Sequence, residues 1–342
     1  MDSSPVGACM VRHRPLFGTN ESRMASLVLQ EIDTYGPDRC GRLDYEQASA
    51  YAHRLVHSQY ENFTVVSWLL PRRFRDDFAH IYAFCRWADD LGDETGDRDR
   101  SLELLDWWRR ELDACYAGEP RHPVFVALGR TIEKLDIPAK PFHDLIDAFV
   151  QDQKIVRYET WEQTCDYCTR SADPVGRLVL YACGLRDEER QRLSDSTCTA
   201  LQLVNFWQDV RRDIVERDRV YVPSEALAVE GLTHDDLVGH VNGDALLSDE
   251  KREGYKRVIK GLVDRTVPLF DRGEGLWPLL PGDVRPSIRL FSMGGRAVCR
   301  GIERIGYDTI DQRPSVGKRA KVGLLARALM GRLMGVGGAG RS

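Results

Sequence analysis

Apolar residues recur every three or four positions along most of this chain, which is the spacing that gathers them on one face of an α-helix. From Leu43 onward the pattern is nearly unbroken, and the alternation typical of a half-buried strand is nearly absent. Helices are predicted over residues 44–58, 62–70, 74–94, 101–116, 123–135, 141–152, 159–183, 187–216, 250–271, 284–306 and 318–334. Prolines and glycines separate these stretches, as expected at helix ends. We therefore expect an all-α fold.

The predicted helices form one continuous series, without a linker that would divide the chain into separate domains. We expect a single all-α domain over residues 43–312, built as a large helical bundle around a central apolar cavity. Residues 1–42 hold scattered proline, glycine, serine and charge, and are predicted to be a weakly ordered N-terminal extension.

Residues 313–342 carry arginines and lysines interleaved with leucine, valine and methionine, and they hold no acidic residue. This composition predicts a basic amphipathic C-terminal segment. Such a segment can make a peripheral contact with an anionic membrane surface. A solvated helix that frays at its glycine-rich end explains the same pattern, so both interpretations stay open.

The composition is that of an ordinary soluble protein, with 342 residues, 42% of them apolar and 30% charged. The net charge of −5 argues against nucleic acid as a partner. No apolar run reaches the roughly 18 residues that a membrane span needs, and Met1 to Pro15 lacks the apolar core of a signal peptide. Nine cysteines, an odd number, favour free thiols in a reducing compartment. These features predict a cytoplasmic protein.

Two acidic clusters lie inside apolar, aromatic-rich sequence. The first reads A-D-D-L-G-D-E and holds Asp89, Asp90 and Asp93. The second reads Q-L-V-N-F-W-Q-D-V-R-R-D and holds Gln202, Asn205, Asp209 and Asp213. In each cluster the outer carboxylates are four residues apart, so on a helix they lie on one face. A single acidic run is usually a solvated helix face, but two runs in such surroundings favour a functional site.

The ligand chemistry of these clusters points to magnesium. Two carboxylate rows that face each other repel unless cations lie between them, and purely oxygen ligands select hard cations. Mg²⁺ in particular prefers one or two carboxylates together with substrate phosphates. Tyr82 and Arg86 share the face of the first cluster, whereas Arg211, Arg212, Arg217 and Arg219 follow the second. The arginines after the second cluster can also be read as surface partners of neighbouring acids.

These motifs, with their flanking sequence, closely resemble the squalene/phytoene synthase family, the trans-isoprenyl diphosphate head-to-head synthases, over about residues 44–321. The matching stretches are F-T-V-V-S-W-L-L-P (63–71), I-Y-A-F-C-R-W-A-D-D-L-G-D-E (81–94), Y-C-T-R-S-A-D-P-V-G-R-L-V-L (167–180), Q-L-V-N-F-W-Q-D-V-R-R-D (202–213), D-R-V-Y-V-P (218–223) and I-E-R-I-G-Y-D (302–308). Their order and spacing agree with the family. The resemblance implies a helical bundle of the isoprenoid synthase type and a Mg-dependent enzyme acting on polyprenyl diphosphates.

The resemblance also implies roles for individual residues. The residues implied to hold about two to three Mg²⁺ ions on the substrate diphosphate are Asp89, Asp93, Asp209 and Asp213, with Asn205 in the same metal set. Gln202 is implied to support the second set. Arg86, Arg219 and Tyr82 match positions that contact or order the diphosphate, and Tyr221 matches a tyrosine beside the leaving group.

One departure from the family points to a branch within it. Members that condense two farnesyl or geranylgeranyl diphosphates usually carry H-S-x-S-F before L-L-P, but residues 59–63 here read Q-Y-E-N-F. That form, with S-A-D-P-V-G-R-L-V-L, is similar to the bacterial hopanoid-pathway branch and within it to hydroxysqualene synthases. These enzymes convert presqualene diphosphate to hydroxysqualene with loss of diphosphate. Asp173 stands where that branch commonly has asparagine, so the assignment to it stays open.

Cofactors and partners follow from the same resemblance. Capture of a carbocation by water needs no reductant, so NADPH is not expected, and no convincing nucleotide-binding motif is present. The implied partners are the enzymes that make presqualene diphosphate and that reduce hydroxysqualene. Two alternatives remain: synthesis of squalene, presqualene diphosphate or phytoene from two linear prenyl diphosphates, and a non-catalytic helical scaffold of the same fold.

Overall fold

The computed structural model describes residues 27–37, 43–57 and 71–314 of the chain. Its elements are α1 (Leu27–Tyr35), α2 (Tyr45–His57), η1 (Arg72–Phe74), α4 (Arg75–Asp93), α5 (Arg98–Tyr116), α6 (Pro123–Leu135), α7 (Lys140–Asp152), α8 (Trp161–Ser171), α9 (Asp173–Ala182), α10 (Glu188–Gln208), α11 (Val210–Arg217), α12 (Ser224–Ala228), α13 (His234–Asn242), α14 (Asp249–Glu274), η2 (Trp277–Leu279) and α15 (Arg285–Arg304). In these ranges β-structure is limited to an isolated bridge between Arg157 and Val220. The prediction of an all-α fold is confirmed.

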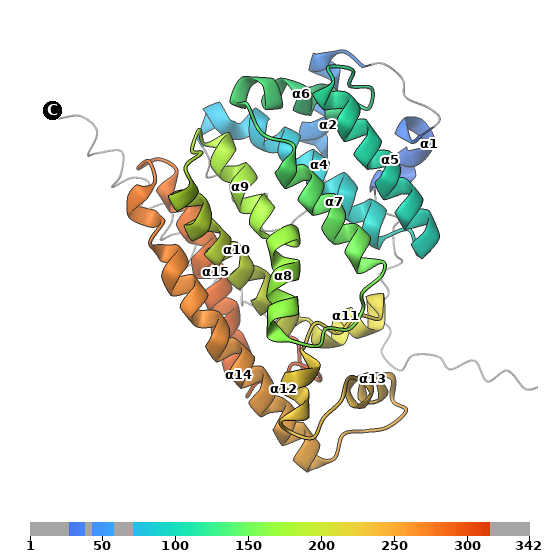
Figure 1. Cartoon of the computed structure of the whole chain (residues 1–342), viewed down its shortest axis with the longest axis vertical. Helices are drawn as coiled ribbons and strands as arrows, with labels where there is room; N and C mark the ends of the chain where they lie inside the picture. Colours follow the sequence, from blue (N-terminus) through green and yellow to red (C-terminus); the bar gives the residue numbers. More distant parts are fainter. Residues whose placement is uncertain (1–26, 38–42, 58–70, 315–342) are drawn as a thin grey trace, which may run out of the picture.

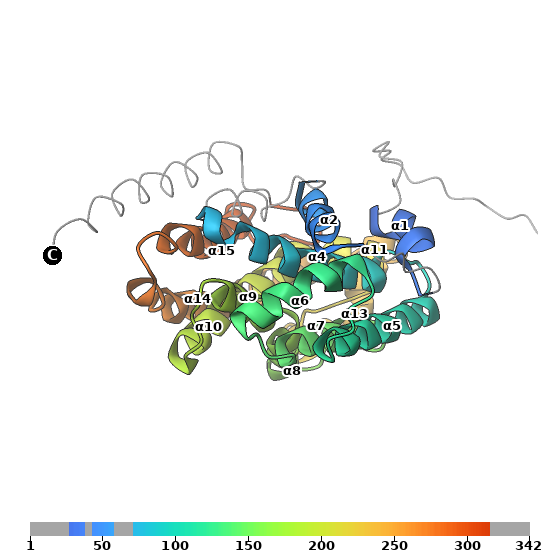
Figure 2. The ribbon, with the colours of Figure 1, turned by 90° about the horizontal axis from the view of Figure 1, so that it is seen from above.

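The helices pack around two main clusters of buried side chains. One cluster joins α1, α2 and α4 to α7, and its large aromatic members include Trp87, Trp108, Phe84, Phe125 and Phe142. The other joins α8 and α10 to α15 and includes Trp207, Tyr255 and Phe270. In Figure 1 the long α14 runs along one edge of the molecule beside α10 and α15, whereas α5, α6 and α7 lie in the other half. Figure 2 gives the same arrangement from above.

Two long predicted helices are each divided in the structure. The stretch 159–183 breaks at Ala172, where Pro174 follows within the first turn of α9 and cannot donate a backbone hydrogen bond. The stretch 187–216 breaks at Asp209, which has φ −106° and ψ 18° between α10 and α11. The short helices α12 and α13 were not predicted from the sequence.

The N-terminal extension differs in part from its prediction. Residues 27–35, expected to be weakly ordered, form α1 because Val28 is buried and the Tyr51 hydroxyl donates a hydrogen bond to Glu31. The predicted helices 62–70 and 318–334 lie outside the described residues, as does most of the basic segment 313–342. The division of the chain at residues 42 and 313 stays a prediction.

Two cavities of the described part are lined by residues outside the acidic motifs. One, of about 420 Å³, lies between α10 and α14 beside Leu193 and Arg272. Another, of about 630 Å³, lies at the starts of α12 and α13 beside Ser224 and His234. The central apolar cavity therefore stays a prediction. Among the helices of residues 27–37, 43–57 and 71–314, none combines the length and apolar character needed to cross a bilayer.

Candidate active site

The first acidic cluster occupies the last turn of α4. Gly92 lets this turn approach α7 closely, because a Cβ atom at that position would lie 3.2 Å from the Phe149 side chain. Asp90 is fully buried, and the Arg86 guanidinium contacts it at 2.5 Å. The same guanidinium lies 3.9 Å from Asp89. Arg86 is thus held against the cluster by the carboxylate that points into the core.

The second cluster continues across the junction between α10 and α11. The Asp209 N–H donates to the Asn205 carbonyl at 2.9 Å, and the Asp213 N–H donates to the Asp209 carbonyl, also at 2.9 Å. The four-residue repeat is therefore kept although Asp209 is not helical. The predicted polar stripe exists, but it bends at its central aspartate.

The two clusters meet through one guanidinium. Nε of Arg217 lies 3.0 Å from Oδ2 of Asp93, and its Nη1 lies 3.6 Å from Oδ1 of Asp213. One side chain reaches both carboxylates, so the two acidic rows face each other. The sequence pattern allowed Arg217 to be a surface partner of nearby acids, but the structure places it between the two motifs.

Arg219 makes a second connection to the first cluster. Its Nη1 atom lies 3.0 Å from Oδ1 of Asp93 and 3.4 Å from Oδ2 of Asp152, the last residue of α7. Arg219 is therefore clamped between two carboxylates from different helices. Its side chain is buried, so this charge is held in a defined place.

Asp152 was not predicted from the sequence, and it organises a group of aromatic hydroxyls. The Tyr167 hydroxyl donates to Oδ2 of Asp152 at 2.6 Å, and the Tyr221 hydroxyl donates to Oδ1 at 3.2 Å. Burial raises the pKa of Asp152 to about 6, although Arg219 acts in the opposite direction. The only sequence signal for this residue was an acid at the end of an otherwise apolar helix face.

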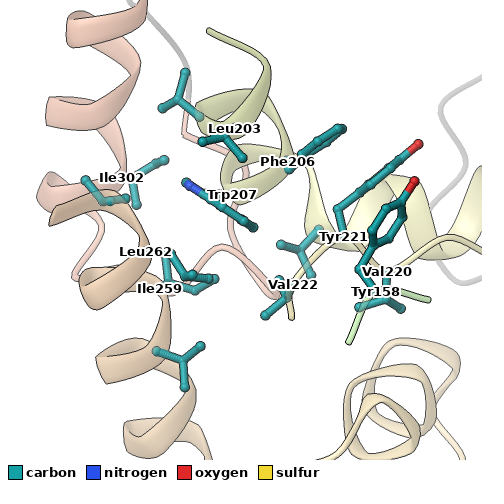
Figure 3. Packing of buried hydrophobic residues seen from close by; sticks show 14 of the residues in the cluster. Tyr158, Leu203, Phe206, Trp207, Val220, Tyr221, Val222, Ile259, Leu262 and Ile302 are labelled. Carbon is teal, nitrogen blue, oxygen red and sulfur yellow. The ribbon is translucent and has the colours of Figure 1, made fainter. Parts of the chain in front are cut away.

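Tyr221 is oriented by aromatic packing. Its ring stacks on Phe206 with centroids 3.7 Å apart and planes 8° from parallel. Figure 3 shows these two rings side by side, with Tyr158 next to Tyr221 and both tyrosine hydroxyls turned away from Ile259. Burial and the Asp152 carboxylate raise the pKa of Tyr221 well above its ordinary value. Its phenol is therefore a neutral hydrogen-bond donor near neutral pH.

The remaining predicted residues lie on the helices that carry the clusters. Tyr82 is half-buried on α4, one helical turn before Arg86. Gln202 is half-buried on α10, three residues before the exposed Asn205. Asp209 pairs with Arg313, whose Nε and Nη2 atoms lie 2.6 and 3.0 Å from its two carboxylate oxygens.

Electrostatics at the site favour added positive charge. Burial raises the pKa of Asp213 to about 7, with Asp209 adding to the shift and Arg217 opposing it. Burial and repulsion from Asp93 raise the pKa of Asp89, whose side chain is still 49% exposed. A cation between the rows would favour the ionised form of both carboxyls.

The oxygen atoms of the two acidic clusters are suitable ligands for a hard divalent cation, although arginine side chains pair with these carboxylates in the structure. In residues 27–37, 43–57 and 71–314 no three histidine, cysteine, aspartate or glutamate side chains converge as a ready metal site. The carboxylates instead pair with guanidinium groups at Asp93 and Asp209. All the candidate ligands are oxygen atoms, as Mg²⁺ requires. Nε of Arg219 is buried without a partner in these ranges, which leaves a donor for an anionic ligand.

Comparisons with known proteins all match this chain to one protein family. A family model described as squalene/phytoene synthase matches residues 56–322. The hydroxysqualene synthase of Zymomonas mobilis is 36% identical over 281 residues, covering 80% of this chain and 89% of that protein. The hydroxysqualene synthase of Rhodopseudomonas palustris is 36% identical over 217 residues, covering 63% of this chain and 70% of that protein. The phytoene synthase of Rhodobacter capsulatus is 29% identical over 279 residues, covering 81% and 79%.

Solved structures show the same fold. The squalene synthase HpnC from Alicyclobacillus acidocaldarius is 43% identical and superposes with a TM-score of 0.70, covering 77% of this chain and 96% of that one. A dehydrosqualene synthase in complex with a ligand superposes with a TM-score of 0.72 at 23% identity, covering 84% of this chain and 96% of that one. At that lower identity the likeness concerns the fold alone.

Proposed function

Because this chain belongs to the squalene/phytoene synthase family, we propose that it is a hydroxysqualene synthase, which converts presqualene diphosphate and water to hydroxysqualene and diphosphate. The relatives that bear this name support the choice of reaction. The structural observation that carries the proposal is the Arg217 side chain lying between Asp93 and Asp213. It brings together two acidic rows that are far apart in the sequence, as binding of one diphosphate by both rows requires.

The metal ligands we propose are Asp89, Asp93, Asn205, Asp209 and Asp213. When bound there, about two to three Mg²⁺ ions would act as Lewis acids that neutralise the charge developing on the departing diphosphate. The donor set described above supports a hard cation of this kind.

Arginines of the chain would bind and orient the diphosphate. Arg86 and Arg219 are each held by a buried carboxylate, Asp90 and Asp152 respectively. Their charges are positioned before the substrate arrives, which reduces the reorganisation needed during the reaction. Tyr82 lies one turn before Arg86, and we propose that it helps to order the same group, with Gln202 supporting the metal ligands from α10.

Aromatic faces near this site would stabilise a carbocation. The stacked Phe206 and Tyr221 rings present electron-rich faces, and a cation above such a face is stabilised by its quadrupole. In the reaction the carbon–oxygen bond to diphosphate breaks, and the cyclopropylcarbinyl cation rearranges. The oxygen of one water molecule then bonds to the cation, and the proton released passes to diphosphate or solvent. No oxidant or reductant enters this balance, so NADPH is not required.

The second candidate is condensation of two farnesyl or geranylgeranyl diphosphates to presqualene diphosphate, squalene or phytoene. Relatives named phytoene synthase, which are 29% identical to this chain, support this condensation as the alternative reaction. We propose that the enzyme is cytoplasmic. We also propose that it receives its substrate from the enzyme that makes presqualene diphosphate and passes its product to the enzyme that reduces hydroxysqualene. We propose that its basic C-terminus contacts the inner face of the membrane, where the apolar product partitions.

Turnover of presqualene diphosphate tests the main proposal. The protein is incubated with presqualene diphosphate and Mg²⁺ in ¹⁸O-labelled water, with and without NADPH, and the product is identified by mass spectrometry. We expect hydroxysqualene that carries one labelled oxygen, in equal amounts with and without NADPH. Consumption of farnesyl or geranylgeranyl diphosphate alone would favour the second candidate. Inactivity towards every one of these diphosphates would favour a non-catalytic scaffold.

A further inference from the structure

Arg313 reaches the second acidic cluster from the far end of the described chain. Its Nε and Nη2 atoms lie 2.6 and 3.0 Å from Oδ1 and Oδ2 of Asp209, which is a bidentate pair. This fork geometry is the strongest form of arginine–carboxylate contact. The guanidinium therefore covers both oxygens of a carboxylate that the family motif assigns to metal binding. Nη1 of Arg212 lies 4.0 Å from Oδ2 of Asp209, and this arginine makes a closer contact, of 2.9 Å, with Glu216.

The segment that carries Arg313 is tied to the α10–α11 junction. The Gln208 side chain donates to the Pro314 carbonyl at 2.7 Å, and the Arg211 guanidinium donates to the Ile310 carbonyl at 3.3 Å. Thr309, upstream, is buried and hydrogen-bonded to Tyr255 of α14. The position of Arg313 is thus set by contacts on both sides, so its pairing with Asp209 belongs to the fold.

Exposure differs between the two partners. The Arg313 side chain is 57% exposed, whereas that of Asp209 is 17% exposed. The arginine can therefore turn towards solvent without unpacking the core, but the aspartate stays where it is. A divalent cation that approaches Asp209 from the side of Arg313 would meet a positive charge already paired with both carboxylate oxygens. Because like charges repel, the two cations compete for that carboxylate.

We propose that Arg313 is the resident counter-ion of Asp209, and that it moves to the substrate diphosphate when a divalent cation takes that carboxylate. The proposal rests on the metal role given to Asp209 under the proposed function. It adds a residue outside both acidic motifs to the diphosphate site. It also assigns a substrate-binding role to the first residue of the basic C-terminal segment.

Metal binding without substrate tests the competition. Mn²⁺ alone is titrated into the full chain, and free Mn²⁺ is followed by electron paramagnetic resonance. Arg313→Gln should bind Mn²⁺ about two to five times more tightly than the natural protein, since a partly exposed ion pair changes affinity by roughly that factor. Arg313→Lys keeps the charge without the fork and should fall between the two.

Inorganic diphosphate tests the second half of the proposal. In the presence of Mg²⁺, calorimetric titration of diphosphate should show about fivefold weaker binding to Arg313→Gln, because one charge-assisted contact is lost. The matched control is Arg192→Gln, which removes an exposed arginine paired with Glu188 at the start of α10. That position is about 25 Å along the helix from Asp209 at 1.5 Å per residue, so neither affinity should change.

A double variant ties the effect to Asp209. In the Asp209→Asn background, Arg313→Gln should no longer change Mn²⁺ affinity, and circular dichroism should confirm that every variant is folded. Unchanged Mn²⁺ and diphosphate affinities in the single Arg313→Gln variant would overturn the proposal while leaving the proposed function intact. Absence of Mn²⁺ binding to both the natural protein and Arg313→Gln would overturn the proposed competition, and absence of binding even with inorganic diphosphate present would overturn the metal role of Asp209 as well. The choice of prenyl substrate affects neither titration.

Discussion

A substitution at Asp152 tests whether the site contains a carboxylate that lowers the stability of the fold but supports activity. The side chain is only 4% exposed, it accepts hydrogen bonds from Tyr167 and Tyr221, and it faces Arg219. Its pKa in the fold is about 6, compared with an ordinary value of 3.8. At 1.36 kcal/mol per pKa unit, the buried ionised carboxylate costs the folded state about 3 kcal/mol. Burial thus outweighs the attraction of Arg219.

The sign of the pH dependence follows from this raised pKa. Below about pH 4 the carboxyl is protonated in both the folded and the unfolded chain and contributes nothing. Between about pH 4 and pH 6 the unfolded chain releases its proton first, so the contribution of Asp152 to stability falls. Above about pH 6 both states are ionised and the full cost remains.

The substitution Asp152→Asn removes the charge and keeps the shape. We expect it to raise the free energy of unfolding at pH 7.5 by up to about 3 kcal/mol, and to weaken the change between pH 6 and pH 4. Turnover should nevertheless fall about tenfold or more, because Arg219 loses one of its two carboxylates and is no longer held in place. Asp152 therefore acts as a positioning residue that is kept at a cost in stability.

Urea denaturation followed by circular dichroism at several pH values measures this effect. The matched control is Asp166→Asn, which removes an exposed surface partner of Arg170 and should change stability by less than about 0.5 kcal/mol. A loss of more than about 2 kcal/mol in Asp152→Asn at pH 7.5 would refute the reasoning. It would mean that breaking the buried ion pair outweighs relief of the buried charge.

Three further changes have defined outcomes. Asp93→Asn weakens the contact to both arginines that pair with this carboxylate; we expect diphosphate release to fall at least about a hundredfold with the helical circular dichroism spectrum retained. Gly92→Ala gains helix propensity but places a methyl group 3.2 Å from Phe149; we expect a net loss of about 1 kcal/mol in urea, and a stability gain would contradict the close approach. Phe206→Leu removes the ring stacked on Tyr221; we expect about 1 to 3 kcal/mol of lost stability and more side products with water added at other carbons, which product analysis would detect.

The helices and the two acidic motifs could be predicted from local pattern. The boundaries 123–135 of α6 match the prediction, and 140–152 of α7 differs by one residue, because apolar periodicity and flanking prolines act over only a few positions. The four-residue spacing of the acids also survives in the fold, even across the bend at Asp209. Periodicity did not predict that bend, since the residue pattern continues through it.

The partners of the acids were decided by tertiary structure alone. Arg217 could pair with Asp213 on its own helix, but its contact with Asp93 depends on how α11 packs against the end of α4. The Asp152 cluster and the pairing of Arg313 with Asp209 likewise join residues that are distant in sequence. Local spacing determines which side chains share a helix face, whereas packing of the apolar faces determines which charges meet. Since Coulombic attraction and desolvation both depend on those contacts, the pairing of charges within the site became visible only in the folded chain.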